Sequence, residues 1–494
     1  MNIKSLNRKL NKKFAGRVTA RLSDGCIVLT GELDDWNDVV DAGMTAATPH
    51  SSTHVVNDIV FTGAAEEKMH MPAINDKALD GEKPDVLVIG GGISGCSVAR
   101  ELSRYKLSVL LIDKEADLAL GASGRNDGEV HPGVDLSKGS LKHKYIRRAN
   151  HMYEDLCREL DVPFKRTGQY ACFTHKSWLP FVSLYAKWRR DHDGIEDTCI
   201  VMGDEIRKKE PSISADVAFA LSNPSSGSVS PYNLVIAYAE NAVQNGARVS
   251  LNTAVTGMDV SGGEIKAVYT NRGTIYPREV INCAGVYSDV VAQMAQDRFF
   301  SIHPRRGTNS ILDKKTGASF HGIASIVMSQ SPVQTHTKGG GILHTMHDNL
   351  LIGPDAVETP ERENTATNAE SIARVFTKQR ITMPTLTEKD IITYFTGVRA
   401  PTYEEDFIIE PGRKTKNIYH VAGIQSPGLT TAPAVAQDVA EYVAKLFNAE
   451  KKADFDPVRK APPHLAEMND AERAELIRQN PDYGCLLYTS DAAD

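Results

Sequence analysis

The chain has 494 residues, 41% of them apolar, with ordinary numbers of Gly and Pro, which argues against a collagen-like or largely disordered protein. A chain of this length holds two or three domains, each with its own core. Its 56 Lys and Arg are outnumbered by 63 Asp and Glu, so the net charge is -7. We therefore expect no nucleic-acid partner, because phosphate backbones favour basic surfaces.

The seven cysteines are scattered and include no C-x-x-C pair, which argues against a redox dithiol and against a zinc site. We therefore predict no metal site and a reducing, cytoplasmic location. No apolar run approaches the roughly 18 residues needed to span a bilayer. The basic start "MNIKSLNRKLNKKF" is not followed by the apolar segment of a signal peptide. Peripheral membrane contact is compatible with these features.

Residues 1–63 are expected to form a small α+β module. The stretch "VTARLSDGCIVLTGEL" contains two alternating runs around Ser23-Asp24-Gly25, a pattern typical of a β-hairpin. Apolar residues then recur at helical spacing, and "HVVNDIVF" predicts a third strand; the helical set is Trp36, Val39, Val40 and Met44. This order resembles, over this segment alone, the BON domain, a small bacterial module associated with binding surfaces. The alternative is an accessory domain that packs on the rest of the chain.

The remaining chain divides into four parts. Residues 64–84, charged and punctuated by Pro and Gly, predict a linker. From Asp85 to about residue 448, strand-like and helix-like segments interleave, including a helix that starts near Ser140 with Leu141, Tyr145, Ala149, Met152, Leu156 and Leu160 on one face. Residues 449–484 are a C-terminal extension. The last residues, "CLLYTSDAAD" (485–494), resemble a translated sequencing adapter, so we interpret them as a non-native tail; a genuine tail is the alternative.

A nucleotide-binding pattern opens the large domain. Val86 to Ile89 predict a buried parallel strand, and Gly90, Gly92 and Gly95 supply a G-x-G-x-x-G turn. A helix beginning at Ile93 and Ser94 would point its unpaired amides at a pyrophosphate. The next buried run, "SVLLID", ends in Asp113, where a carboxylate can accept hydrogen bonds from ribose hydroxyls; Lys114 follows it. Together these features predict a dinucleotide site, which NAD and FAD would both satisfy.

Three later blocks favour a long, extended cofactor. The polar loop "GASGRNDGEVHPG" contributes Ser123, Gly124, Arg125 and Asn126, and the strand in "VINCAGVYSD" ends at Ala284 and Gly285. The block "IYHVAGIQSPGLTTAPA" predicts a strand, a turn and a helix; its candidate cofactor residues are Gly423, Gln425, Ser426, Gly428 and Leu429. Amides at that helix start would stabilise the negative charge of a reduced flavin. Val255 and Gly397 complete the predicted cofactor set.

From about 85 to 484 the chain resembles the FAD-dependent D-amino-acid oxidase superfamily, in its glycerol-3-phosphate dehydrogenase-like branch and close to 2-hydroxyglutarate oxidases. The motifs that carry the resemblance are "VIGGGISG", "GASGRNDGEVHPGV", "ELDVPFKRTGQYACF", "VINCAGVYSD", "NLLIGPDA", "TGVRAP" with "DFIIE", and "VAGIQSPGLTTAPA". The resemblance implies bound FAD and oxidation of a C–H bond beside O or N. It also implies an α/β plus α+β fold, in which a Rossmann-like FAD domain joins a mostly antiparallel substrate domain, beside the small N-terminal module.

The substrate site needs a cation and a base. Arg399 in "TGVRAP" is the best anchor for an anion, because a guanidinium grips carboxylate or phosphate bidentately, and the family places an arginine of this motif in its substrate pocket. His131 follows the flavin loop, where the branch often has a histidine near the flavin ring, and would serve as the base. Lys338 and Arg306, or Arg305 beside it, could add positive charge. The alternatives are a salt-bridged Arg399, a structural His131 and solvated cations elsewhere.

The leading hypothesis is an FAD-dependent dehydrogenase of sn-glycerol 3-phosphate. A 2-hydroxy acid or an amino acid is the alternative substrate, and a non-catalytic flavin-bound scaffold or sensor is the alternative of another class. The sequence "RNDG" departs from the branch, where Ser or His commonly follows Asn, and this leaves the polarity of the pocket and the substrate open.

The electron acceptor would be oxygen, a quinone or an iron-sulfur partner. The second glycine cluster, Gly339 to Gly341, lacks the later glycine of a dinucleotide turn and lies in a predicted strand or hairpin, so we expect no separate NAD(P)H site. In this branch the chain often continues past a stretch like "ELIRQNPDYG" into a Cys-rich iron-sulfur domain. Cys485 alone cannot hold a cluster, and a truncated chain is our interpretation.

Overall fold

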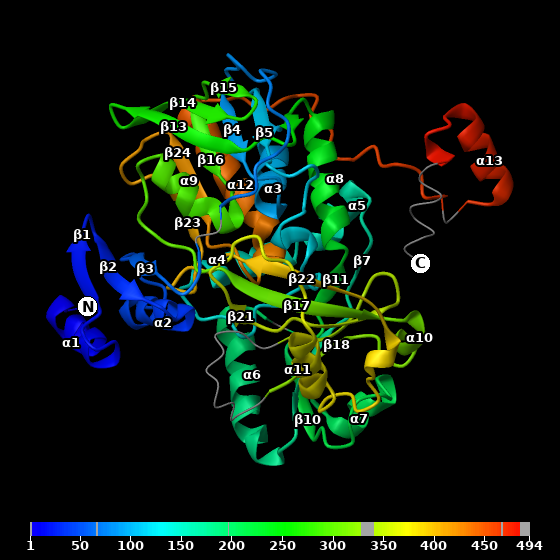
Figure 1. Ribbon diagram of the computed structural model, residues 1–494. Coiled ribbons are helices and arrows are strands. Elements are labelled where there is room, and N and C mark those ends of the chain that lie inside the picture. Colours follow the sequence, from blue (N-terminus) through cyan, green and yellow to red (C-terminus); the bar gives the residue numbers. More distant parts are fainter. Residues whose placement is uncertain (1, 66–67, 196, 328–339, 466–467, 485–494) are drawn as a thin grey trace.

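The computed structural model describes residues 2–65, 68–195, 197–327, 340–465 and 468–484. Figure 1 shows two large parts stacked one above the other, with a small blue module beside their junction. The upper part is built on a six-stranded sheet and the lower part on a nine-stranded sheet. Segments from β4 (Val86–Ile89) onward alternate between the two.

The upper sheet forms because several short runs are apolar on both faces. Its strands in spatial order are β12 (Arg248–Ser250), β5 (Val109–Ile112), β4 (Val86–Ile89), β16 (Glu279–Asn282), β24 (Ile418–Ala422) and β23 (Ile408–Pro411). All neighbours are parallel except β23 and β24. Parallel sheets are covered on both sides, which explains the continuous apolar runs of β4 and β5.

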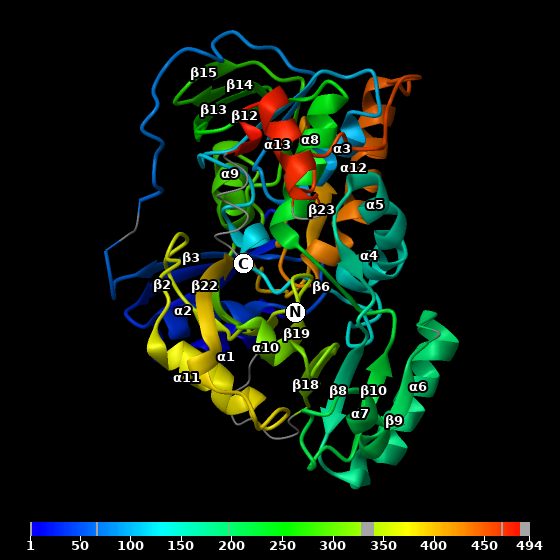
Figure 2. The same cartoon turned by 90° about the vertical axis from the view of Figure 1, so that its right-hand side faces the viewer.

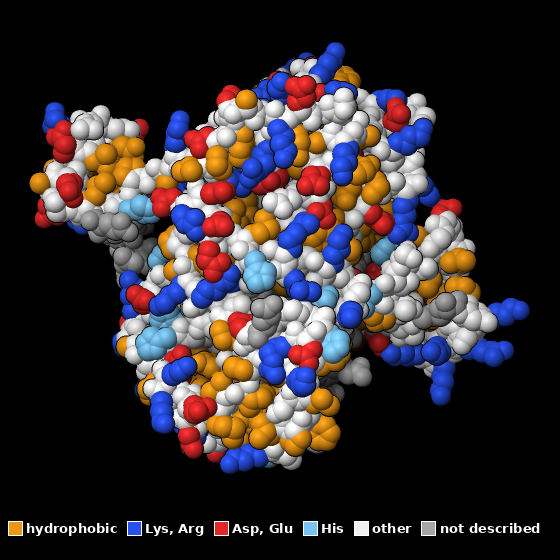
Figure 3. Space-filling model, turned by 180° about the vertical axis from the view of Figure 1, so that it is seen from behind, with side chains coloured by type: hydrophobic (Ala, Val, Ile, Leu, Met, Phe, Trp, Pro, Cys, Tyr) orange, Lys and Arg blue, Asp and Glu red, His pale blue; other side chains and the backbone are white. Residues whose placement is uncertain are grey.

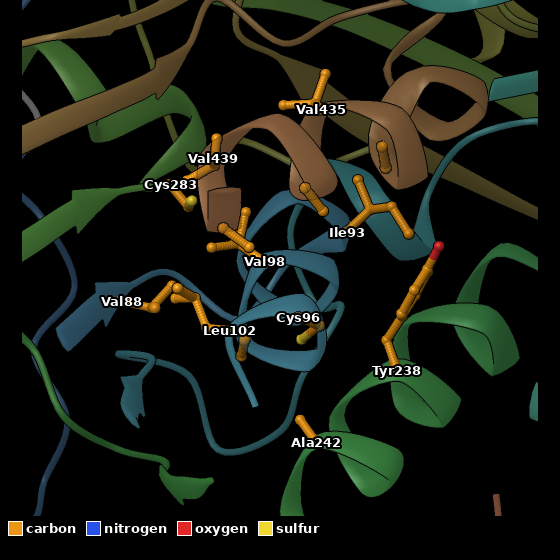
Figure 4. Packing of buried hydrophobic residues seen from close by; sticks show 14 of the residues in the cluster. Val88, Ile93, Cys96, Val98, Leu102, Tyr238, Ala242, Cys283, Val435 and Val439 are labelled. Atoms are coloured by element: carbon orange, nitrogen blue, oxygen red, sulfur yellow. The ribbon is translucent and has the colours of Figure 1, made fainter. Parts of the chain in front are cut away.

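Alternate residues of β4 serve the two faces of this sheet. Val86 and Val88 pack against helices, whereas Leu87 and Ile89 pack against a three-stranded antiparallel layer. The helices on the first face are α3 (Ile93–Leu102), α8 (Pro231–Gln244) and α12 (Gly428–Phe447). The second layer consists of β13 (Val255–Ser261), β14 (Glu264–Thr270) and β15 (Gly273–Ile275), with α9 (Ser288–Met294) alongside. Figure 4 shows α3 enclosed by α12 and α8, with Val98 and Val439 meeting between helices.

The lower sheet is antiparallel except where β18 meets β8, which confirms the predicted mostly antiparallel substrate domain. Its strands are β21 (Val357–Glu358), β17 (Arg305–Leu312), β20 (Leu350–Gly353), β19 (Gly341–His344), β18 (Ile323–Ile326), β8 (Gln169–Phe173), β10 (Phe219–Asn223) and β9 (Cys199–Met202), with β22 (Ile391–Arg399) paired to β17. The helices of this part are α6 (Leu179–Asp193), α7 (Gly203–Lys209), α10 (Lys314–Gly317) and α11 (Ala369–Gln379). Gly341 of the second glycine cluster begins strand β19, and Gly339 lies outside the described residues.

A short three-stranded sheet lies between the two parts and comprises β6 (Glu129–Val130), β11 (Gly227–Val229) and β7 (Phe164–Lys165). The helix predicted from Ser140 is present, and the Ser140 hydroxyl caps it by accepting a hydrogen bond from the His143 amide. The apolar stripe continues over two helices instead of one, α4 (Leu141–Asn150) and α5 (Tyr153–Leu160). The apolar residues of α4 and α5 still form one stripe because both helices pack on the same core.

The N-terminal module (residues 2–63) contains the predicted hairpin, helix and third strand. Its elements are α1 (Ile3–Lys13), β1 (Val18–Ser23), β2 (Cys26–Leu33), α2 (Trp36–Ala46) and β3 (Val55–Phe61). β1 and β2 pair antiparallel around Asp24 and Gly25, which both have positive φ, as a tight hairpin requires. β3 adds parallel to β2. Helix α1 was not predicted; it contributes Leu6 and Leu10 to the module's core.

Three outer features complete the fold. Residues 68–84 run along the upper part in Figure 2, and Leu79 is buried against the β13–β15 layer, so this predicted linker is packed.

At the lower end, α6 exposes large apolar side chains, which contribute to the orange patch of Figure 3; they are Phe181, Leu184, Tyr185 and Trp188, preceded by Trp178. Helix α13 (Asp470–Gln479) ends the described chain and buries no residue. Within the described residues, no helix is both long and apolar enough to cross a bilayer. The predicted non-native tail lies outside those residues.

Candidate active site

The glycine turn after β4 has the geometry that the sequence motif predicts. Gly90 has a φ of +112°, which an L side chain rarely adopts. A Cβ on Gly95 would lie 1.8 Å from the Gly90 carbonyl oxygen, so only glycine lets α3 approach the strand this closely. Gly92 caps α3, and a Cβ there would meet the Ser123 hydroxyl at 2.8 Å. The turn therefore exposes the amides of the α3 start to an incoming anion.

A cavity of about 550 Å³, the cofactor cavity, extends from this turn to the start of α12. Most of the predicted cofactor residues line it: Gly90, Gly92, Ile93, Ser94, Asp113, Lys114, Ser123, Arg125, Asn126, Val255, Ala284, Gly285, Gly397, Gln425, Ser426, Gly428 and Leu429. Helices α3 and α12 both begin at its wall, so two positive helix ends face the same space. Two helix starts and a glycine cradle suit a long cofactor with a pyrophosphate in its middle.

Three of the glycines predicted to bind the cofactor are absent from the lining of the cofactor cavity. Gly95 provides the close packing of α3, a Cβ on Gly124 would lie 2.6 Å from the Ala119 carbonyl oxygen, and Gly423 has a φ of +67° in the turn after β24. These residues shape the backbone and do not line the cavity.

Met69 and His70, from the segment predicted as a linker, do line the cofactor cavity, and the His70 amide donates to Glu363.

Asp113 lines the cofactor cavity, but its carboxylate is already bonded to the backbone. It accepts from the Gly91 amide at 2.5 Å and from the Glu115 amide at 2.7 Å. Burial raises the pKa of this carboxyl, while the two amide bonds oppose that shift. Asp113 therefore fastens the glycine turn to the end of β5, in addition to facing the space where a ribose would lie.

A smaller cavity of about 210 Å³, the chamber, adjoins the cofactor cavity. The two share the side chains of His131 and Arg399, together with Asp127, Glu129, Gln425 and Ser426. The polar wall of the chamber also includes Asp135, Lys142, Gln169, Ser325 and Glu405. The sequence analysis missed Asp127, Glu129, Lys142 and Glu405. Lys142 follows the cap of α4 and would ordinarily be expected on the solvent side of a helix, and the position of Glu405 depends on a contact between distant strands.

Arg399 ends β22 and faces the chamber without a carboxylate partner among the described residues. Its guanidinium donates to the carbonyl oxygens of Arg306, at 3.0 Å, and Asp355, while its buried Nε has no bond. Burial lowers the pKa of Arg399 to about 10, with the neighbouring Arg305 as the second cause. The group is still a cation at neutral pH, and this charge is available to an anion in the chamber.

The other predicted cations lie differently. Arg305 is buried and pairs with Glu358 at 2.5 Å and with Glu405 at 2.7 Å, so its charge is compensated within the protein. Arg306 lies outside both cavities and donates to the Ala366 carbonyl, because strand alternation turns Gly307, and not Arg306, toward the cofactor cavity. Lys338 lies outside the described residues.

His131 is held between the two cavities. Its Nε2 lies 3.2 Å from the Ser426 hydroxyl, and its Nδ1 lies 3.2 Å from Glu129 Oε1. Glu129 and His131 are two residues apart around β6, which places both side chains on the same side of the backbone. Gln169 donates to the same Glu129 oxygen at 2.7 Å and Ser226 at 3.3 Å. A carboxylate at Nδ1 favours the tautomer with its proton there, in which Nε2 carries the lone pair that can accept a proton.

Lys142 and Asp127 also contribute ionisable groups to the lining of the chamber. Lys142 is buried, and burial lowers the pKa of its amine, although Glu405 and Asp406 oppose the shift. Burial, with Glu129 beside it, raises the pKa of Asp127. Arg399 and Lys142 thus face Asp127 and Glu129, a carboxyl pair that resists double ionisation. Asp135 and Glu405 also line the chamber, and Glu405 is paired with Arg305. A small anion in the chamber would bind at the two cations. In the part of the chain that the structure describes, no cluster of three His, Cys, Asp or Glu side chains could hold a metal ion.

Comparison with known proteins agrees with this architecture. The model of the family "FAD dependent oxidoreductase" matches residues 85–442. A glycerol 3-phosphate dehydrogenase of Caloramator mitchellensis is 36% identical over 407 residues, which cover 82% of this chain and 83% of that protein. An L-2-hydroxyglutarate dehydrogenase of Indibacter alkaliphilus is 28% identical over 406 residues, covering 73% of this chain and 99% of that protein.

Among solved structures, the L-alpha-glycerophosphate oxidase of Mycoplasma pneumoniae with FAD bound aligns with a TM-score of 0.70 at 26% identity. The alignment covers 77% of this chain and all of that one. The glycine turn, the two helix starts and the adjoining cation-lined chamber lie within the matched region. The chain therefore belongs to the FAD-dependent oxidoreductase family, and FAD is its cofactor.

Proposed function

We propose that this protein oxidises sn-glycerol 3-phosphate at its secondary alcohol to dihydroxyacetone phosphate. The observation that carries the proposal is the uncompensated Arg399 in a small chamber that opens onto the cofactor cavity beside His131. Its similarity to the glycerol 3-phosphate dehydrogenase of Caloramator mitchellensis supports this choice of substrate. A three-carbon phosphate ester is also of a size suited to a chamber of about 210 Å³.

The residues of the cofactor cavity fit FAD. The glycine turn and the α3 start would hold the pyrophosphate, and the α12 start at Gly428 and Leu429 would face the electron-rich end of the flavin. A Cβ on Gly92 or Gly397 would come within 3 Å of Ser123 or Arg125, so glycine at both positions lets the polar loop pack closely against the cavity wall. FAD, when bound, supplies the acceptor for the hydride that leaves the alcohol carbon.

The chain's own groups supply binding and proton transfer. Arg399 and Lys142 hold the phosphate by charge-assisted hydrogen bonds and fix the orientation of the alcohol. His131 Nε2 accepts the hydroxyl proton as the C–H bond gives up its electron pair, so the substrate loses one proton and one hydride in total. Glu129 balances the imidazolium that forms, at its contact with Nδ1.

An anaerobic titration tests the substrate. Purified holoprotein is mixed with sn-glycerol 3-phosphate in the absence of oxygen, and the flavin absorption is followed. Bleaching at stoichiometric substrate, with dihydroxyacetone phosphate as product, is the expected result. A spectrum that stays oxidised while the FAD remains bound refutes this substrate, and bound FAD that none of the tested small anions reduces favours a scaffold or sensor.

A 2-hydroxy acid is the second candidate, because L-2-hydroxyglutarate dehydrogenases are also similar over most of this chain. A single carboxylate could occupy the same place on Arg399. Bleaching by L-2-hydroxyglutarate but not by glycerol 3-phosphate would assign this substrate. An amino acid is tested in the same titration.

The electron acceptor, quinone, oxygen or an iron-sulfur partner, and the cytoplasmic location stay predictions. We place the expected peripheral membrane contact on α6, because Trp178, Phe181 and Trp188 are exposed there and aromatic rings favour the membrane interface. Co-sedimentation with anionic vesicles should fall when Phe181 and Trp188 are replaced by Ser. Unchanged sedimentation would remove α6 from this role.

A further inference from the structure

The N-terminal module lies outside the family match, yet it packs against the segment that follows Arg399. This segment, residues 400–407, connects β22 to β23 and is called the 400–407 loop here. Figure 1 shows the module beside the junction of the two large parts. Apolar side chains of β2 and β3 share a buried cluster with Ala400 and Ile408, at the two ends of the loop; the module's members are Cys26, Val28 and Val56.

Tyr403 is the central contact. It is buried and belongs to the same apolar cluster as Leu29, Val39 and Ile59 of the module. Its hydroxyl accepts a hydrogen bond from Asn57 Nδ2 at 2.8 Å. A Cβ on Gly43 would lie 2.2 Å from the tyrosine ring, so α2 has a glycine where the ring meets it. The module therefore provides the pocket in which Tyr403 sits.

Polar contacts from the module hold two further residues of the loop, Glu404 and Asp406. The Val55 amide donates to Glu404 Oε1 at 2.7 Å, and His54 lies 3.4 Å from the other oxygen of that carboxylate. His50 Nδ1 lies 3.2 Å from Asp406 Oδ2. Three of the loop's side chains are thus fixed by β3 and the turn before it.

The same loop forms part of the chamber. Glu405 lines the chamber and bonds to Arg305 and to Gln425 Nε2, the latter at 2.5 Å. Asp406 accepts from the amides of Leu141, at 2.9 Å, and Lys142, at 3.2 Å, and so anchors the start of α4 that carries the Lys142 amine. On its other face, Tyr403 stacks on His303 with the ring centroids 4.6 Å apart. His303 in turn bonds to Glu358, the second partner of Arg305.

We propose that the N-terminal module is a positioning element of the substrate site, which holds the 400–407 loop so that Arg399 and Lys142 are preset for a small anion while Glu405 stays paired with Arg305. Asn57 and Tyr403 are the positioning residues, since neither lines a cavity and both connect the module to side chains that do. The identity of the anion rests on the proposed function; the positioning role does not.

The test compares three holoprotein variants. Tyr403→Phe removes only the hydroxyl, Asn57→Ala removes its donor, and Thr19→Ala alters an exposed residue of the same module that bonds only within it. Inorganic phosphate is titrated against each, with perturbation of the flavin spectrum as the signal, and KM and kcat for glycerol 3-phosphate are measured in parallel. Hydrogen exchange reports the amides of the 400–407 loop and of the first turn of α4.

The first two variants should weaken phosphate binding and raise KM by about two- to tenfold each, the range of one lost hydrogen bond. We expect kcat and FAD content to stay within about twofold and exchange to accelerate in both segments, with Thr19→Ala like the wild type. Unchanged phosphate affinity in Tyr403→Phe and Asn57→Ala, with or without faster exchange, overturns the proposal. So does a wild-type protein that takes up no phosphate, because a preset anion site must bind it. A wild type that binds phosphate but is not reduced by glycerol 3-phosphate refutes the substrate alone.

Discussion

Arg305 and Arg399 are direct partners across β17 and β22, yet only Arg399 is free to bind an anion from outside the chain. Glu358 and Glu405 neutralise Arg305, whereas Arg399 bonds only to carbonyl oxygens among the described residues. The Arg399 guanidinium therefore keeps its charge, and its further N–H donors can bind a phosphate or carboxylate. The distinction between two neighbouring arginines is thus made by their carboxylate partners.

We expect Arg399→Ala to raise KM for the anionic substrate by on the order of 10²-fold, because charge-assisted hydrogen bonds are lost. Arg306→Ala is the matched control, since that guanidinium lies outside both cavities. Steady-state kinetics on both variants checks this expectation. Equal effects of the two substitutions would contradict the assignment of the anchor.

His131→Asn should lower the rate of flavin reduction by roughly 10²- to 10⁴-fold, the usual contribution of a positioned general base. The FAD content should not change, because the side chain of His131 bonds to Ser426 and Glu129 and lies at the edge of the cofactor cavity. Stopped-flow mixing under anaerobic conditions measures this rate directly. A loss smaller than about threefold would assign the histidine to structure.

Residues of the site differ in how well a sequence reveals them. The glycines at 90, 92 and 95 are predictable because one local turn demands them. Arg399 and His131 were found through motifs and do line the cavities. Lys142, by contrast, faces the chamber because Asp406, more than 260 residues away, anchors the first turn of its helix. No local pattern contains that information.

At the scale of elements, the approach of α3 to β4 depends on a missing side chain. Gly95→Ala would place a methyl group 1.8 Å from the Gly90 carbonyl oxygen, so the helix must shift. We expect a loss of about 1–3 kcal/mol in the free energy of unfolding, typical of overpacking, and release of FAD on gel filtration. Gly257→Ala on β13 is the control, because its nearest atom is 3.6 Å away. Retention of FAD in Gly95→Ala would contradict this role for the turn.

Strand β16 contains a buried carboxyl that makes stability depend on pH. Burial raises the pKa of Glu279 to about 8, and neither oxygen has a hydrogen-bond partner among the residues that the structure describes. The folded protein therefore keeps a proton that the unfolded chain, with an ordinary glutamate pKa of about 4.3, releases. Stability should be full below that value and fall as pH rises toward about 8. Chemical denaturation should show this slope in the wild type and a shallower one in Glu279→Gln; parallel curves would contradict it.

Elements with a strong local signal were predictable. The strand, turn and helix of β4 and α3 and the hairpin of β1 and β2 match the sequence patterns, because alternation, glycine turns and caps are local. The division of one apolar stripe into α4 and α5 was not predictable, since a common core can accept two helices as readily as one. Helix α1 was missed because it buries only Leu6 and Leu10 in a basic sequence.

On the scale of the whole molecule, the module and the oxidoreductase share a buried interface, so we expect them to unfold together. Trp178→Phe and Trp188→Phe leave Trp36 of the module as the one tryptophan of the chain. Its fluorescence and the release of FAD should then follow one denaturation curve. Two separated midpoints would show that the module unfolds independently.

The sequence allowed the two sheets and their interleaving to be anticipated from the order of motifs. The docking of the module was not predictable, because its contacts join residues about 350 positions apart, such as Asn57 and Tyr403. The composition of residues 64–84, between the module and the oxidoreductase, predicted a linker, yet Met69 and His70 of this segment line the cofactor cavity. Packing between distant surfaces decided both outcomes.

The wide separation of Asn57 and Tyr403 bears on how the protein is made. The module is synthesised before the loop that covers part of its apolar face, because Tyr403 follows Asn57 by 346 positions. At translation speeds of about 5–20 residues per second, the module's apolar face lacks the 400–407 loop for many seconds. A nascent chain stalled before residue 400 would therefore present Val28 and Val56 to chaperones, and the young polypeptide needs such protection until the 400–407 loop has emerged.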